Sequence, residues 1–348
     1  MRDKPVISFP RIGNYHIPVK RLLHALLPDA EVVLPPPMTQ RTLELGSGQS
    51  PDLVCAPFKF NMGNFQQALE LGANVLLQTG MGCRFGYYGE LQETILRDMG
   101  YDFDFVLLGR ENAGLKKIYA ILRGLGGRGG YLKFLRELLL TVESIRCMDR
   151  FEYLMRERMA FETEKGSFAK AHAQLLRAME KVNTFRELYT VRRRLNVARI
   201  DYAPPESYLK IGLVGELFTT MEPYSNHYIE RYLIERGISV SRMMNATFLL
   251  FEKKRLSPGG YLKYAIGANG RDSVAQAKMY AERGYDGVIH MKSFGCTPEI
   301  NAMPALRNLA SDCKIPILHL SFDTHTAQEG LRTRLEAFVD MIKKEVPL

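Results

Sequence analysis

The chain has 348 residues, of which 46% are hydrophobic and 24% charged, a composition that excludes disordered, collagen-like and coiled-coil proteins. At roughly 100 to 200 residues per domain, this length predicts two or three domains. The apolar runs are much shorter than the roughly 18 residues of a membrane span, and MRDKPVISFP lacks the apolar core of a secretory signal, so we expect a cytoplasmic protein without a membrane partner.

Short apolar runs alternate with amphipathic stretches in the N-terminal part of the chain. Strands are predicted at residues 5–9, 31–34, 52–55, 74–78 and 104–108. Helices are predicted at residues 18–27, 64–71 and 90–99, the last two followed by a glycine that accepts a positive φ. Strands alternating with short helices predict a mostly parallel sheet covered by helices on both faces.

The α/β pattern is interrupted by a helical segment and then resumes. Apolar residues recur at helical spacing from about residue 112 to residue 197. Later strands are predicted at residues 210–214, 239–243, 286–291 and 316–320, and later helices at residues 225–236, 272–283, 302–311 and 330–344. We therefore predict an N-terminal α/β domain (1–110), a helical segment (111–205) and a C-terminal α/β domain (206–348).

The five cysteines stand in two kinds of setting, and their odd number and irregular spacing predict reduced thiols rather than disulfides. Cys55, Cys83 and Cys296 each follow a predicted strand, in a Gly- or Pro-containing loop near a helix start. Parallel sheets bind ligands at that edge, and helix N-termini there stabilise the thiolate that ligates metals. Cys147 lies within a predicted helix and Cys313 precedes a strand, so both are expected to be structural.

Three thiolates from separate loops could hold zinc or an iron–sulfur cluster, or could be unrelated. Zinc is disfavoured because the C-x2-C spacing of zinc sites is absent. A site with three cysteines leaves one coordination position open, which suits catalysis better than a purely structural role.

Two other residues at predicted strand ends have ordinary alternatives. Glu216 follows the strand at 210–214, where its carboxylate could handle a proton, bind substrate or cap a helix. His290 stands on a buried strand, which favours a core position over a ligand. No phosphate-binding loop of the Walker type is present, so the chain is not expected to hydrolyse ATP itself.

Four groups of residues resemble the 2-hydroxyacyl-CoA dehydratase family. They are Cys55–Lys59 with Gly63 and Asn64, Gly82–Glu90, Val288–Ile300, and Ser321–Asp323 with Thr333–Phe338. Within the family, the resemblance is closest to one branch. Its members are described as similar to the 2-hydroxyglutaryl-CoA dehydratase D-component or as related to CoA protein activases. Benzoyl-CoA reductases and double-cubane cluster proteins are more distant members, and residues 111–205 match the family less distinctly.

The resemblance implies Rossmann-like or flavodoxin-like parallel-sheet domains and a [4Fe-4S] cluster whose three cysteines are Cys55, Cys83 and Cys296. It also implies a separate ATP-hydrolysing iron–sulfur activase that delivers one low-potential electron for radical dehydration of a 2-hydroxyacyl-CoA thioester. The characterised dehydratases pair two related subunits, so a heterodimer or a homodimer is expected.

Residues close in sequence to these cysteines are expected to surround the cluster and to tune its potential through hydrogen bonds. They are Arg84, Tyr87, Tyr88 and Glu299. Because a [8Fe-9S] double cubane needs six cysteines and the chain has five, we favour one [4Fe-4S] cluster with one iron that lacks a cysteine ligand. The other functions considered are a non-catalytic electron-transfer or assembly partner and a double-cubane-type reductase of small molecules.

The positive charge of the chain is concentrated in the helical segment. Between Arg110 and Ile200 there are 20 Lys and Arg against 10 Asp and Glu. This excess could be a solvated helical face, a docking surface for an acidic redox partner, or a place for the phosphates of CoA. Nucleic acid is an improbable partner because no nucleic-acid motif is present and aromatic residues do not interleave with the basic ones.

Overall fold

A computed structural model describes residues 4–80, 82–108 and 114–345. The chain divides into two compact units, an N-terminal unit of residues 1–145 and 179–188 and a C-terminal unit of residues 146–178 and 189–348. The helical segment thus contributes to both units. The predicted boundary at residues 110 and 111 lies outside the described residues, and the division into three parts stays a prediction.

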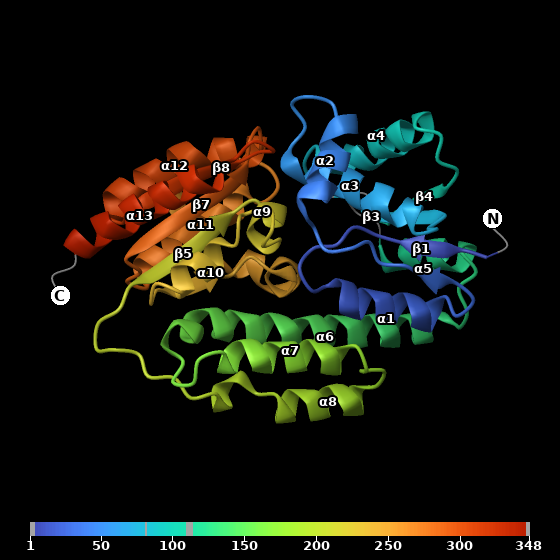
Figure 1. The fold of residues 1–348 in the computed structure, drawn as a ribbon, viewed down its shortest axis with the longest axis horizontal. Coiled ribbons are helices and arrows are strands. Elements are labelled where there is room, and N and C mark those ends of the chain that lie inside the picture. The colour runs from blue at the N-terminus through green and yellow to red at the C-terminus, as the bar shows by residue number, and fades with distance from the viewer. Residues whose placement is uncertain (1–3, 81, 109–113, 346–348) are drawn as a thin grey trace. The chain divides into compact units, whose positions relative to one another are not determined.

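The N-terminal unit contains a four-stranded parallel sheet in the order β2-β1-β3-β4, of which β1, β3 and β4 are labelled in Figure 1. Its strands are β1 (Val6–Ser8), β2 (Glu31–Val32), β3 (Val75–Thr79) and β4 (Asp104–Leu108). Side chains of α1 (His16–Leu26) and α5 (Leu115–Gly124) pack with Val75 and Leu77. Those of α3 (Ala56–Glu70) and α4 (Phe85–Asp98) pack with Leu76, so the alternation along β3 places a helical layer on each face.

The C-terminal unit repeats this plan with the order β6-β5-β7-β8. Its strands are β5 (Lys210–Gly215), β6 (Ser239–Arg242), β7 (Gly287–Ser293) and β8 (Ile317–Phe322). Residues of α10 (Ile229–Ile234) and α13 (Gln328–Glu345) pack on one face. Residues of α11 (Gly270–Glu282) and α12 (Thr297–Cys313) pack on the other face. The predicted α/β class with two parallel-sheet, Rossmann-like domains is confirmed.

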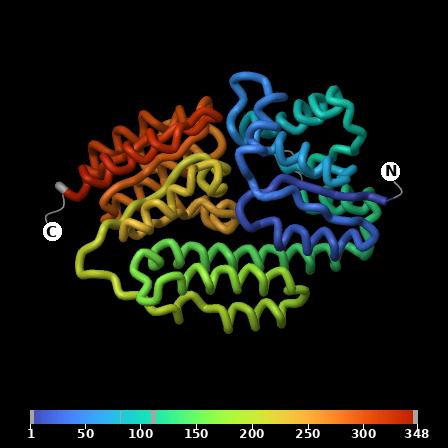
Figure 2. Tube along the Cα trace, in the orientation of Figure 1, coloured from blue at the N-terminus to red at the C-terminus, as the bar shows by residue number. Residues whose placement is uncertain are grey.

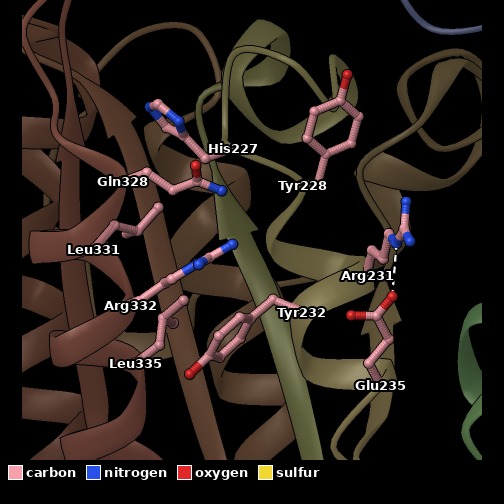
Figure 3. A pocket seen from close by; sticks show the side chains of 9 residues that line it. All are labelled: His227, Tyr228, Arg231, Tyr232, Glu235, Gln328, Leu331, Arg332 and Leu335. Carbon is pink, nitrogen blue, oxygen red and sulfur yellow. Dashed lines mark hydrogen bonds and ion pairs between the residues drawn. The ribbon is translucent and has the colours of Figure 1, made fainter.

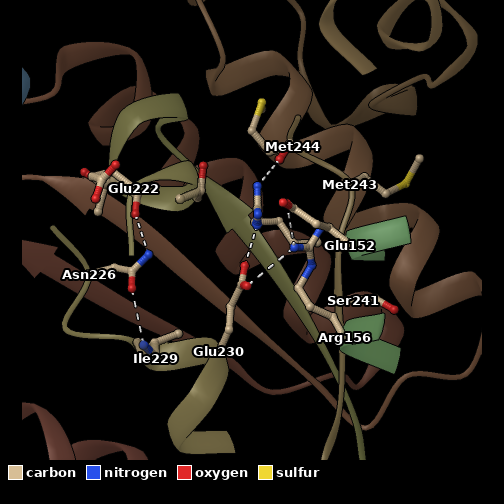
Figure 4. Close-up of polar contacts among 12 residues, drawn as sticks. Glu152, Arg156, Glu222, Asn226, Ile229, Glu230, Ser241, Met243 and Met244 are labelled. Carbon is tan, nitrogen blue, oxygen red and sulfur yellow. Dashed lines mark hydrogen bonds and ion pairs between the residues drawn. The ribbon is translucent and has the colours of Figure 1, made fainter. Parts of the chain in front are cut away.

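Besides α5, the longer helices of the predicted helical segment are α6 (Tyr131–Arg158), α7 (Ser167–Met179) and α8 (Phe185–Arg194). In the C-terminal unit, α7 lies beside the second half of α6 (Figure 2), and His172 Nε2 is 3.0 Å from Glu152 Oε1. Arg156 of α6 and Arg242 of β6 both pair with Glu230 of α10 (Figure 4). These buried guanidinium groups fasten α6 to the sheet within this unit.

Several helices begin earlier than the sequence pattern predicts. The helix α3 starts at Ala56 instead of residue 64, and α12 starts at Thr297 instead of residue 302. Each has a proline in its first turn, where the missing N–H would have no partner in the helix. The helix α2 (Gln40–Gln49) was not predicted because two glycines and few apolar residues hide its period.

The remaining helical elements are short. They are η1 (Met159–Phe161), η2 (Val197–Arg199), α9 (Leu217–Met221), η3 (Phe248–Glu252), η4 (Lys253–Arg255) and η5 (Gly259–Tyr261).

The helices α2 and α3 approach each other closely at Gly46. A Cβ at Gly46 would overlap the carbonyl oxygen of Lys59, whereas a Cβ at Gly48 would meet nothing within 4 Å. We predict that Gly46→Ala lowers the free energy of unfolding by about 2 kcal/mol, because α2 must move away from α3. Gly48→Ala should leave it unchanged or raise it by up to about 1 kcal/mol. Urea denaturation of both variants measures this difference, and equal stabilities would contradict the close packing.

Candidate functional site

Two of the predicted cysteine ligands occupy equivalent places in the two units. Cys83 lies in the loop between β3 and α4, and Cys296 lies between β7 and α12. In each sheet the strand before that loop is central, next to the first strand of its unit. The chain order reverses between these two strands, and open α/β sheets bind ligands at such reversals.

The third cysteine is not where the strand pattern places it. Residues 52–55 form no strand, so the prediction that Cys55 follows one is wrong. Residues 52–55 join α2 to α3 and pair with no strand. Leu53 in this connection is 85% exposed and has a φ of 50°. Cys55 is instead the N-cap residue of α3.

All three cysteines nevertheless lie at a helix N-terminus, each at that of a different helix. Cys296 is the N-cap of α12 and Cys55 is the N-cap of α3, both with extended backbone. Cys83 directly precedes Arg84, the N-cap of α4. All three are half-buried thiols outside any disulfide, and the positive end of a helix dipole lowers the cost of a thiolate at each position.

The remaining cysteines stand apart from these helix starts. Cys147 lies within α6, and Cys313 is the exposed last residue of α12, with its Sγ 3.9 Å from Tyr261 Oη. Over the part of the chain that the structure describes, no three His, Cys, Asp or Glu side chains form a metal-binding group.

Tyr88 brings a hydroxyl to Cys55. The two side chains come from different helices, and the Cys55 Sγ donates to Tyr88 Oη at 3.5 Å. Tyr88 is buried, and its ring packs edge-on against Phe58 with centroids 4.8 Å apart. Burial and the neighbouring Cys55 raise the pKa of Tyr88, so its hydroxyl keeps its proton and can donate it to a Cys55 thiolate. By contrast Tyr87 is 71% exposed and Arg84 is also exposed.

Glu216 caps a helix immediately after β5. Its carboxylate accepts hydrogen bonds from the backbone N–H groups of Phe218 at 2.7 Å and Thr219 at 2.9 Å, and from the Thr219 hydroxyl at 2.7 Å. Burial raises the pKa of Glu216, these hydrogen bonds lower it, and the carboxylate of Glu299 raises it again. The two carboxyl groups therefore interact electrostatically within the C-terminal unit.

Glu299 is completely buried and contacts His290, which in turn contacts His319. Its Oε2 is 2.9 Å from His290 Nε2, and His290 Nδ1 is 2.9 Å from His319 Nδ1. His290 is also fully buried. His319 was not singled out from the sequence, although the predicted parallel strands at 286–291 and 316–320 could have placed it beside His290.

Lys292 adds a cation to the same region. Burial lowers the pKa of Lys292, while Cys296 and Glu299 raise it because the ammonium is attracted to both. The carboxyl edge of β7 therefore carries a thiol, a carboxyl group and an amine within one unit.

A separate pocket of about 220 Å³ lies between α10 and α13 (Figure 3). Tyr232 and Leu335 line it, and Arg231 forms an ion pair with Glu235 at its rim. None of the predicted site residues is among its lining residues.

The contact between Tyr88 and Cys55 generates a prediction about the reactivity of this thiol. Tyr88→Phe should raise the pKa of Cys55 by about one unit, because the thiolate loses a buried hydrogen-bond donor. The pH dependence of Cys55 alkylation, followed by mass spectrometry of its peptide, measures this shift. Tyr87→Phe is the matched control and should leave the profile unchanged. Identical profiles for wild type and Tyr88→Phe would show that the hydroxyl does not act on the thiolate.

The helices described are all too short or too polar to cross a lipid bilayer.

Among curated proteins, none matches the chain. Residues 271–342, about a fifth of the chain, match the family model of the 2-hydroxyglutaryl-CoA dehydratase D-component. The matched residues include α11, β7, α12 and β8, and thus Cys296, Glu299 and both histidines of the buried contact. The resemblance to the 2-hydroxyacyl-CoA dehydratase family is therefore confirmed, through a D-component match over residues 271–342.

Proposed function

We propose that this protein is an iron–sulfur component of the 2-hydroxyacyl-CoA dehydratase type, with Cys55, Cys83 and Cys296 as ligands of one [4Fe-4S] cluster. The observation that carries the proposal is the placement of three half-buried thiols at helix N-termini, one of them within the D-component match. The reaction would be dehydration or reduction of a substrate, with a CoA thioester as the expected class.

The donor set suits such a cluster. Cysteine thiolates are the ligands of iron–sulfur clusters, and the helix N-termini supply N–H groups and a positive potential that favour thiolates. A bound cluster supplies one-electron chemistry, which radical dehydration requires. Three cysteine ligands would leave one iron without a protein thiolate, and that position would be open to water or substrate.

The side chains around the thiols have distinct tasks in this proposal. Tyr88 Oη lies 3.5 Å from Cys55 Sγ and would donate a hydrogen bond to the Cys55 thiolate from a fixed position, since its ring is held by packing against Phe58. Lys292 offsets negative charge near Cys296. Glu216 is held in one orientation by three hydrogen bonds, so its carboxyl group can hold a proton at a defined place at the edge of the sheet.

The proposed partner is an ATP-hydrolysing iron–sulfur activase, and a second related subunit or a second copy of this chain would complete the assembly. The side chains of Arg192, Arg193 and Arg194 at the end of α8 are exposed, as a docking surface requires. Complementary charge speeds the encounter of two proteins and is screened over about 8 Å at physiological ionic strength.

Iron analysis tests the ligand set directly. In protein prepared without oxygen, Cys55→Ser, Cys83→Ser and Cys296→Ser should each lower bound iron and sulfide severalfold, because serine is a poor cluster ligand. Cys147→Ser and Cys313→Ser are matched controls that should keep the wild-type iron content. Full iron retention in the Cys296→Ser variant would remove this residue from the ligand set, and loss of iron in a control variant would contradict the open coordination position.

Charge reversal on α8 tests the partner surface. Replacing Arg192, Arg193 and Arg194 by glutamate should slow ATP-dependent reduction by an activase about tenfold at low salt and flatten its salt dependence, because the encounter loses its electrostatic steering. The iron content should not change. Unchanged reduction kinetics across a salt series would leave these arginines as a solvated helical face.

A further inference from the structure

The residues Glu299, His290 and His319 form an unbroken hydrogen-bonded chain across two strands and a helix of the C-terminal unit. His290 and His319 are register partners on the adjacent parallel strands β7 and β8. Side chains at such paired positions lie on the same face of a sheet. His290 Nδ1 and His319 Nδ1 are 2.9 Å apart, and His290 Nε2 and Glu299 Oε2 are also 2.9 Å apart.

The two ends of this chain differ in their access to water. Glu299 and His290 are completely buried, whereas His319 is half-buried and so reaches the surface of the unit. Burial lowers the pKa of His319 to about 4, together with the neighbouring His290 and the cations Arg307, Lys292 and Arg334. His319 is therefore neutral near pH 7, and one of its ring nitrogens remains free of a proton.

When both imidazoles carry a single proton, the chain has one direction. An ionised Glu299 accepts from His290 Nε2–H, which leaves His290 Nδ1 as an acceptor for His319 Nδ1–H. The outer nitrogen of His319, Nε2, is then unprotonated. Every hydrogen bond in the chain can reverse in concert, as in a proton wire.

A structural role alone does not account for Glu299, the buried end of this chain. Within the described ranges, Glu299 Oε1 is buried and has no hydrogen-bond partner, although a carboxyl group buried only for packing would normally be fully hydrogen-bonded. Like-charge interaction with Glu299 also raises the pKa values of Glu216 and Asp272, in each case after the larger effect of burial.

We propose that His319, His290 and Glu299 are a proton relay between the surface of the C-terminal unit and the carboxyl edge of β5 and β7. A proton from water binds to His319 Nε2, the proton on His319 Nδ1 passes to His290 Nδ1, and the proton on His290 Nε2 passes to Glu299 Oε2. One proton enters and one carboxylate becomes a carboxylic acid, and no electron moves. The use of that proton by a substrate at the Glu216 edge rests on the proposed function.

Exchange of a buried ring proton tests the relay on the protein alone. In protein labelled with ¹⁵N-histidine, the His290 ring N–H should exchange with water at least tenfold faster than the backbone amides of β7, although both are buried. His319→Gln should slow this exchange at least tenfold, because glutamine can hold the hydrogen bond but cannot bind one proton while releasing another. His325→Gln is the matched control, an exposed histidine of the same unit, and should leave the rate unchanged.

The amide exchange of β7 separates a relay from loosening of the fold, since a destabilised variant exchanges its amides faster while a blocked relay does not. Glu299→Gln should leave fast exchange at His290, because water enters from the His319 side. If the His290 proton exchanges as slowly as the β7 amides in wild type, the relay is overturned, and this comparison stands even if His319→Gln does not fold. The measurement needs neither iron nor substrate. Slow exchange would overturn the relay without affecting the iron analysis, and absence of iron would overturn the proposed function without affecting the exchange result.

Discussion

Parallel pairing of β5 with β7 is the constraint on which the C-terminal unit depends. Val214 pairs with His290 and Gly215 with Met291, so both strands reach the same edge of the sheet. The backbone of Gly215 passes so close to Met291 that a Cβ would overlap the carbonyl oxygen, and its φ of 143° suits glycine. Glu216 can therefore leave the sheet beside β7, with its N–H bonded to the Met291 carbonyl at 2.9 Å.

The same arrangement in the N-terminal unit explains why two cysteines occupy equivalent positions. In both sheets the strand preceding the cysteine loop lies next to the first strand of its unit. The loops that leave these two strands turn toward opposite sides of the sheet, the arrangement at which open α/β sheets bind ligands. Cys55 has no cysteine counterpart, because α11, which also precedes the central strand of its unit, has Asn269 at its N-cap. The two units therefore share a topology but differ in the chemistry at one helix start.

Buried polar groups in the C-terminal unit have two different roles. Glu230 pairs with Arg156 and Arg242, and these contacts join a helix of the central segment to the sheet, so that removal of one partner would leave a buried charge. Glu299 instead has one oxygen bonded to His290 and one without a partner in the described part of the chain. The first set of contacts holds elements together, whereas the open oxygen of Glu299 leaves that carboxyl group able to exchange a proton.

The sequence by itself determined the fold class, the helical segment and the central strands, because hydrophobic periodicity and glycine stops are local signals. It also identified the loops of Cys83 and Cys296, since each follows a strand with a clear apolar run. It misplaced Cys55, because an apolar pair as short as Leu53-Val54 does not reveal whether it joins a sheet. Only the tertiary structure brought Tyr88 to Cys55 and aligned His290 with His319 and Glu299, because these contacts arise from helix packing and strand register between segments distant in the chain.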